Sequence, residues 1–146
     1  MKIAIGCDHG GFALKAELLP FIESLGHEAA DFGCMNEQSV DYPDVAVPVA
    51  QSVVSGAYER GILICGTGVG ISISANKVRG ARCAHCSEET SARLSREHND
   101  ANLLALGGRT LGVELAKSIV RTFLSTEFSG ADRHMKRICK ISDFEA

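Results

Sequence analysis

The sequence predicts an α/β fold: a three-layer αβα sandwich on a five-stranded, doubly wound parallel sheet, Rossmann-like in arrangement. Apolar runs alternate with helix-length segments five times along the 146 residues. A glycine-rich turn, Gly66–Gly70, directly follows the most apolar of these runs. No linker, low-complexity tract or fixed-period repeat divides the chain. Alternating strands and helices form parallel sheets whose right-handed crossovers place helices on both faces.

The five strands are expected at short apolar or β-branched runs bounded by turn residues. The clearest is Gly61–Cys65 (GILIC), which has the length and apolar character of a buried strand. The other four are expected at residues 2–7, 28–32, 81–86 and 102–106.

The first helix is predicted by Leu14, Leu18, Ile22 and Leu25, which recur at helical spacing before Gly26. Pro20 lies inside this segment and should bend it or mark a weak turn. Residues 42–55 are rich in valine, but Pro43 suits a helix start and two prolines disfavour a central strand. Further helices are expected at residues 71–77, at residues 88–97 with Ser87 as N-cap, at residues 111–124, and from residue 132.

The length fits one domain. We expect residues 1–146 to form a single domain, with a basic helical tail at about residues 131–146 that contacts a partner subunit. The net charge of −3 argues against a nucleic-acid binder, and the 5% aromatic content and absence of Trp argue against base stacking.

No apolar run approaches the roughly 18 residues of a membrane span. The opening MKIAIGCDHGG does not have the pattern of a signal peptide. We therefore expect a cytoplasmic protein with no membrane partner and six reduced cysteines. Cys83-Ala-His-Cys86 has metal-like spacing, but no second pair completes a site, so we predict buried thiols and no metal.

Chemically active residues follow four of the predicted strands, and ligands of doubly wound sheets bind at the carboxyl ends of strands. We expect the following residues at this edge: Asp8 and His9; Cys65 with Gly66–Gly70; His85 and Cys86; and Gly107, Gly108 and Arg109. The pair His98-Asn99 precedes the last strand, and we expect it to face the same edge.

The Gly66–Gly70 turn fits neither the dinucleotide fingerprint, because Ile71 stands where the third glycine belongs, nor the phosphate-loop pattern. Successive amides feeding a helix N-terminus still make an anion nest. Such a turn favours the thiolate of the preceding Cys65, which would then act as a nucleophile or carbon-acid base. The alternative interpretation is a tight turn that binds nothing and a thiol that is inert.

Three polar groups carry further candidates. Asp8 and His9 can handle protons or hold a hydroxylated ligand, or Asp8 can simply cap a helix. His98-Asn99 offers a titrating ring and an amide, or else a solvated loop. Arg133-His134-x-x-Arg137 places two guanidiniums on one helix face, which suits phosphate but also fits a solvated basic face.

Segments spread over almost the whole chain resemble ribose-5-phosphate isomerase type B, in the family shared with galactose-6-phosphate isomerase subunits. The resemblance rests on Gly6-Cys7-Asp8-His9 with Gly11-Phe12, Asp41-Tyr42-Pro43, residues 61–72 with Ala75-Asn76-Lys77, Cys86-Ser87-Glu88, residues 95–100, Gly108-Arg109, and Arg133-His134-x-x-Arg137. It implies a metal-free, cofactor-free aldose–ketose isomerase of phosphorylated pentoses in the non-oxidative pentose phosphate pathway.

The resemblance also implies roles for individual residues. Cys65 is then the base that moves a proton between C1 and C2, and His98 opens the sugar ring with Asp8 on the opposing side. The remaining assignments are Gly66, Thr67, Gly68, Val69 and Gly70 for the enediolate oxygen; Asn99 and Arg109 for the sugar; His9, Arg133, His134 and Arg137 for the phosphate; and Tyr42 nearby. The site lies at a dimer interface, so we expect a homodimer and leave a tetramer open.

The sequence departs from the family at one point and leaves alternatives. Asp132 stands where a glycine is frequent, and it either weakens phosphate binding or starts the tail helix. Some members use a glutamate elsewhere as base, but Cys65 is present here. An isomerase of allose or galactose 6-phosphate and a non-catalytic phosphosugar-sensing module remain alternatives. A thiol redox protein is disfavoured, because the pair Cys83 and Cys86 is not at the glycine turn.

Overall fold

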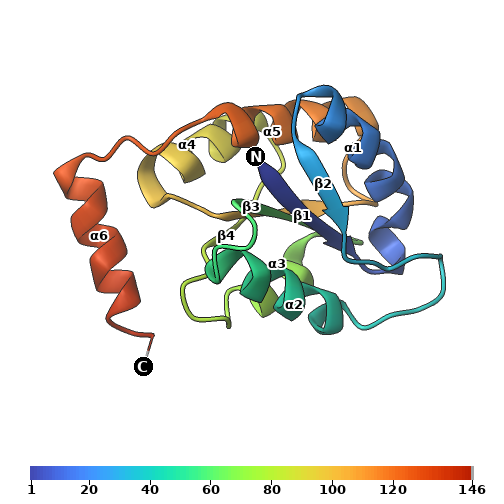
Figure 1. Cartoon of the computed structure of the whole chain (residues 1–146), viewed down its shortest axis with the longest axis horizontal. Helices are drawn as coiled ribbons and strands as arrows, with labels where there is room; N and C mark the ends of the chain where they lie inside the picture. The colour runs from blue at the N-terminus through green and yellow to red at the C-terminus, as the bar shows by residue number, and fades with distance from the viewer. Residues whose placement is uncertain (146) are drawn as a thin grey trace.

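The computed structural model describes residues 1–145 and confirms the predicted α/β sandwich (Figure 1). Its sheet has five parallel strands in the order β2-β1-β3-β5-β4. The strands are β1 (Lys2–Cys7), β2 (Glu28–Asp31), β3 (Arg60–Cys65), β4 (Cys83–His85) and β5 (Leu103–Gly107). The helices are α1 (Phe12–Ser24, after the 3₁₀ turn His9–Gly11), α2 (Tyr42–Val54), α3 (Val69–Ala75), α4 (Glu89–Asn99), α5 (Val113–Ser125) and α6 (Asp132–Ser142).

Two hydrophobic cores cover the two faces of the sheet. Helices α1, α4 and α5 pack on the face that receives Ile3 and Ile5, and α2 and α3 pack on the face that receives Ala4. Successive side chains of a strand point to opposite faces, so β1, β3 and β5 are buried on both sides. Strands of this kind appear in the sequence as unbroken apolar runs, which is why they were predictable.

The proline-containing segments are helical. Pro20 lies inside α1 and does not end it. Pro43 occupies the first turn of α2, as predicted, and Pro48 lies in its interior. The valine-rich segment is therefore a helix that buries Val45 and Val49 against the sheet.

Several boundaries differ from the prediction. The N-cap of α4 is Glu88 and not Ser87, because the Glu88 carboxylate accepts a hydrogen bond from the Ser91 amide at 2.7 Å. Helix α3 begins at Val69, since Gly68 adopts a left-handed conformation (φ 82°) that turns the chain into the helix. Helix α4 continues to Asn99, and β4 is shorter than expected.

Helix α6 stands clear of the sheet, at the left of Figure 1. Asp132 is its first residue, where a carboxylate matches the positive end of the helix dipole. The helix rests on the end of α4, and its remaining surface is largely exposed. Ala146, the last residue of the predicted tail, lies outside the described residues. No helix within residues 1–145 is both long and apolar enough to cross a membrane.

Candidate active site

The loops that follow β1, β3 and β5 touch through their backbones at the carboxyl edge, the edge where the strands end. A Cβ on Gly10 would lie 2.9 Å from the Gly66 nitrogen, and one on Gly108 would clash with the Gly10 carbonyl oxygen. Hydrogen bonds join the same loops: the Gly108 amide donates to the Cys65 carbonyl oxygen at 2.8 Å, and the Asp8 amide donates to that of Ile64 at 3.1 Å. Glycine is therefore required where these loops meet.

Cys65 is the last residue of β3 and its side chain is buried within the glycine turn. The Gly68 amide donates a hydrogen bond to Cys65 Sγ at 3.1 Å, and the left-handed conformation of Gly68 aims that amide at the sulfur. The next amide, that of Val69, donates to Thr67 Oγ1 at 3.3 Å. The sulfur of Cys65 therefore lies against a backbone N–H group of the glycine turn.

Cys7, Cys83 and Cys86 are at least partly buried and lie away from the glycine turn. Burial raises the pKa of Cys7 to about 12, that of Cys83 to about 12 and that of Cys86 to about 11. These groups are therefore protonated thiols at neutral pH. Cys139 is exposed on α6. The position of Cys65 on the glycine turn distinguishes it from all of them.

Asp8 and His9 line the same edge after β1. Asp8 is 6% exposed, and its Oδ1 accepts a hydrogen bond from the Gly10 amide at 2.8 Å, so it does cap the short turn that follows. The His9 Nδ1 accepts from the Val40 amide at 3.2 Å. A neutral imidazole that accepts at Nδ1 carries its proton on Nε2, which leaves an N–H free for a ligand.

Tyr42 and Arg109 complete this edge. A Cβ on Gly70 would lie 2.6 Å from Tyr42 Cζ, so the phenol ring lies over the first turn of α3. A Cβ on Gly66 would lie 3.2 Å from Arg109 Nη1, which places the guanidinium beside the glycine turn. The structure thus brings nine of the predicted residues to the edge that holds Cys65. They come from the loops after β1, β3 and β5, from the first residue of α2 and from the start of α3.

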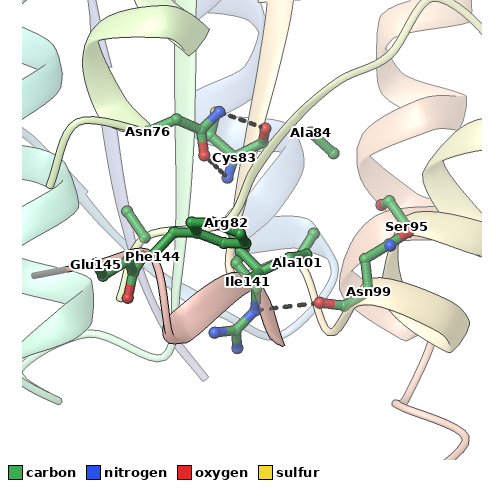
Figure 2. Close-up of a pocket in the computed structure, with 11 residues that line it drawn as sticks. Asn76, Arg82, Cys83, Ala84, Ser95, Asn99, Ala101, Ile141, Phe144 and Glu145 are labelled. Carbon is green, nitrogen blue, oxygen red and sulfur yellow. Dashed lines mark hydrogen bonds between the residues drawn. The ribbon is translucent and has the colours of Figure 1, made fainter. Parts of the chain in front are cut away.

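His98 and Asn99 do not face this edge, and that part of the prediction is wrong. Each helix of such a sheet carries the chain back, so the end of α4 lies at the amino edge, where the strands begin. Arg82, just before β4, donates from Nε to the Asn99 carbonyl oxygen at 3.1 Å, as Figure 2 shows. The Gly61 amide, near the start of β3, donates to the Asn102 carbonyl oxygen at 3.0 Å.

The basic residues of α6 lie beside His98 at the amino edge. The His98 and His134 rings stack with their centroids 4.2 Å apart and their planes at 17°. His134 is 4% exposed, whereas Arg133 and Arg137 are exposed. Burial, followed by the nearby His98, Arg133 and Arg137, holds the pKa of His134 below its usual value. Within one chain, the predicted phosphate residues of α6 are therefore separated from Cys65 by the length of the sheet.

Arg96, which the sequence analysis did not single out, is a buried cation that binds the turn at the end of α4. Arg96 is 1% exposed and donates from Nη1 to Asp100 Oδ1 at 2.8 Å and to the Ala101 carbonyl oxygen at 2.6 Å. Asp100 has a left-handed backbone (φ 45°) and also pairs with Arg82 at 3.3 Å. The one indication of this role in the sequence is that Arg96 follows Ala92 by four residues, which places both on the buried face of α4.

A pocket of about 540 Å³ also lies at the amino edge, between β4 and the end of α6 (Figure 2). Its walls are mostly apolar, and its charged residues already have partners. Arg82 binds the turn after α4, and the Glu145 carboxylate accepts from the Gly80 amide at 3.1 Å. The pocket contains Asn99 but none of the residues around Cys65. Residues 1–145 contain no cluster of three or more metal-ligating side chains.

The fold and the carboxyl edge together define a doubly wound α/β enzyme with a buried cysteine, Cys65, inside a glycine-rich turn. Comparison with known proteins then specifies the family. The family model described as Ribose/Galactose Isomerase matches residues 3–141, and the chain belongs to that family. The resemblance seen in the sequence is thereby confirmed.

Curated relatives and solved structures match this chain over nearly its full length. Ribose-5-phosphate isomerase B of Escherichia coli is 50% identical over 144 residues, which is 99% of this chain and 96% of that protein. A Clostridium thermocellum ribose-5-phosphate isomerase B structure matches with a TM-score of 0.97 and 55% identity, over 99% of this chain and 97% of that one. The Trypanosoma brucei type B ribose 5-phosphate isomerase has a TM-score of 0.95 and 44% identity, with 97% of each chain covered.

Proposed function

We propose that this protein interconverts ribose 5-phosphate and ribulose 5-phosphate through an enediolate, with no metal or cofactor. Relatives that carry this activity in their names match the chain end to end. The observation that carries the chemistry is the hydrogen bond from the Gly68 amide to Cys65 Sγ at the head of the glycine turn. A non-catalytic phosphosugar sensor needs an anion site but has no use for a thiolate in it.

In the proposed reaction, the Cys65 thiolate removes the C2 proton of the open-chain aldose. The electron pair left at C2 forms the C1–C2 double bond, and negative charge develops on the carbonyl oxygen. Amides of Gly66–Gly70, assisted by the Thr67 hydroxyl, stabilise that oxygen. One such donor is typically worth about 3 kcal/mol of transition-state stabilisation. Return of the proton from Cys65 to C1 and transfer of a hydroxyl proton give the ketose.

The sugar ring must open before this step, and His98, the acid–base group proposed for that task, sits at the other edge of the chain. We propose a homodimer, or a tetramer built from such dimers, in which the partner subunit brings its amino edge to Cys65. His98 of the partner subunit then opens the furanose with Asp8 on the opposing side, and the partner's Asn99 helps to hold the sugar. Arg109 also helps to hold the sugar, and His9 from one chain and the partner's Arg133 and Arg137 hold the phosphate.

Mixing two inactive variants tests the shared site. Cys65→Ala and His98→Asn homodimers are each expected to lack turnover. After unfolding and co-refolding in equal amounts, half the dimers are mixed, and each mixed dimer has one intact site, so about a quarter of wild-type activity should return. No recovery of activity would place His98 and Cys65 in the same site of one chain and refute the shared arrangement.

Solvent deuterium exchange separates the two chemical steps. Ribulose 5-phosphate has no free hydroxyl that can close a furanose, so exchange of its C1 proton needs Cys65 but not ring opening. Cys65→Ala should abolish both turnover and exchange, whereas His98→Asn should lose turnover of ribose 5-phosphate and keep exchange. Wild-type exchange in Cys65→Ala would show that Cys65 is not the base. Exchange losses in His98→Asn as large as its turnover losses would remove the ring-opening role.

The family description includes galactose, so a six-carbon substrate is the second candidate. Turnover of ribose, allose and galactose phosphates in the presence of a chelator discriminates between them. The highest kcat/KM identifies the sugar, and loss of activity on chelation would refute the metal-free reaction. We also propose a cytoplasmic location, where the six free cysteines stay reduced, and a role in the non-oxidative pentose phosphate pathway.

A further inference from the structure

We propose that His134 is a positioning residue that holds the ring of His98 by stacking, and that it is not a phosphate ligand. This inference rests on the proposed function, because it assigns His98 the ring-opening step. It separates His134 from Arg133 and Arg137, its neighbours on α6, with which the sequence grouped it.

The geometry favours a ring-to-ring contact over a ligand contact. The two imidazoles overlap in a stack, with centroids 4.2 Å apart and planes at 17°, as aromatic pairs do when they pack face on. His134 is buried, and its Nε2 atom is inaccessible and has no hydrogen-bond partner within residues 1–145. Burial of Nε2 makes this nitrogen inaccessible to a phosphate oxygen. The flanking Arg133 and Arg137 side chains are exposed and can reach a phosphate.

Basic side chains lie around His134 and disfavour its protonated form. His98 faces it from α4, and Arg133 and Arg137 approach it from α6. Protonation of His134 would add a cation to a buried group beside three basic side chains. Burial and these basic neighbours lower the pKa of His134, which disfavours its protonated form, and its flat ring lies against that of His98.

His98 depends on this surface for its orientation. It is the next-to-last residue of α4, where the helix ends at the left-handed Asp100. Within the described part of the chain, no side-chain hydrogen bond holds the His98 ring, so the stack on His134 restrains its rotation. An acid–base group that loses its alignment with the reacting atoms loses rate, and small misplacements can cost up to about a hundredfold.

Substitutions at His134 distinguish a positioning surface from a ligand. His134→Ala removes the ring, and His134→Phe keeps a flat ring while removing the unpaired nitrogen. We expect His134→Ala to lower kcat on ribose 5-phosphate roughly ten- to hundredfold. Its C1 deuterium exchange on ribulose 5-phosphate and its inhibition by inorganic phosphate should stay within about twofold of wild type. His134→Phe should recover kcat to within about threefold of wild type.

Controls on the same helix complete the experiment. Arg137→Ala should raise KM for both sugars and weaken phosphate inhibition, and Lys136→Ala, on the exposed face, should change nothing. The inference is overturned if His134→Phe is as slow as His134→Ala, if His134→Ala weakens phosphate inhibition as Arg137→Ala does, or if His134→Ala turns over at the wild-type rate. Failure of the wild-type protein to isomerise ribose 5-phosphate would instead refute the proposed function, so the two failures are distinguishable.

Discussion

Replacement of Arg96 by methionine tests whether one buried cation holds the end of α4 in place. The Arg96 guanidinium donates to the Asp100 carboxylate at 2.8 Å, to the Ala101 carbonyl oxygen at 2.6 Å and, from Nε, to the Thr126 carbonyl oxygen at 3.2 Å. It also lies 5.8 Å from the centre of the Phe123 ring. Methionine preserves the apolar stem of the side chain and removes all three donors.

The expected loss follows from the groups left without a partner. A buried carbonyl that loses its donor costs about 1–3 kcal/mol, and breaking a buried ion pair costs about 3–5 kcal/mol. Asp100 is 37% exposed and retains Arg82 at 3.3 Å, so its own penalty is reduced. We therefore expect Arg96→Met to lower the free energy of unfolding by about 3 kcal/mol.

Urea denaturation at a fixed protein concentration measures this loss, with Arg93→Met as the matched control. Arg93 lies one turn earlier on α4 and pairs with Glu97 at 2.9 Å, but its side chain is 47% exposed. An exposed pair of this kind contributes no more than about 0.5 kcal/mol. A loss below about 1 kcal/mol in Arg96→Met, or one equal to that of the control, would refute the idea that Arg96 anchors the turn.

Three further outcomes are expected. Gly68→Ala should lose deuterium exchange and about 1–2 kcal/mol of stability, because Gly68 has a φ of 82° and an added Cβ would lie 2.7 Å from the His85 ring. The control Gly112→Ala should keep both exchange and stability, because an added Cβ there meets no atom within 4 Å. At pH 8, iodoacetamide followed by peptide mass spectrometry should label exposed Cys139 but not Cys7 or Cys86 in the folded protein, and rapid labelling of either would contradict their raised pKa values. The pKa values of Cys7, Cys83 and Cys86 lie above that of an unfolded thiol, so these thiols contribute fully to stability below about pH 9. This contribution is lost as the pH rises toward 11–12. Urea midpoints measured as a function of pH test this loss.

The strands and the carboxyl-edge site were largely predictable because each depends on residues close together in the sequence. Burial on both faces makes β1, β3 and β5 continuous apolar runs. The turn after Cys65 is recognisable in the sequence because it has three glycines in five residues. The short strand β4 was predicted too long. Its burial is only partial, so the apolar pattern around it does not mark where pairing with β5 stops.

The placement of His98 was mispredicted for a topological reason. Its position between a helix and a strand suggested the carboxyl edge, but the helix returns the chain to the amino edge before β5 begins. The role of Arg96 was hidden for a different reason. One of its acceptors, Thr126, is 30 residues away at the end of α5, and no local pattern connects the two. The stack of His98 on His134 likewise joins two distant helices.

The backbone contact among the loops after β1, β3 and β5 limits how this protein can be re-engineered. Gly10 and Gly108 leave no room for a side chain, so saturation libraries at these positions should yield almost only inactive clones. Residues 35–39 have exposed side chains, and the Val40 amide that follows them donates to His9 Nδ1. Substitutions intended to change the substrate range are therefore best introduced in this surface segment, which lies beside loops whose backbone contacts tolerate no added side chain.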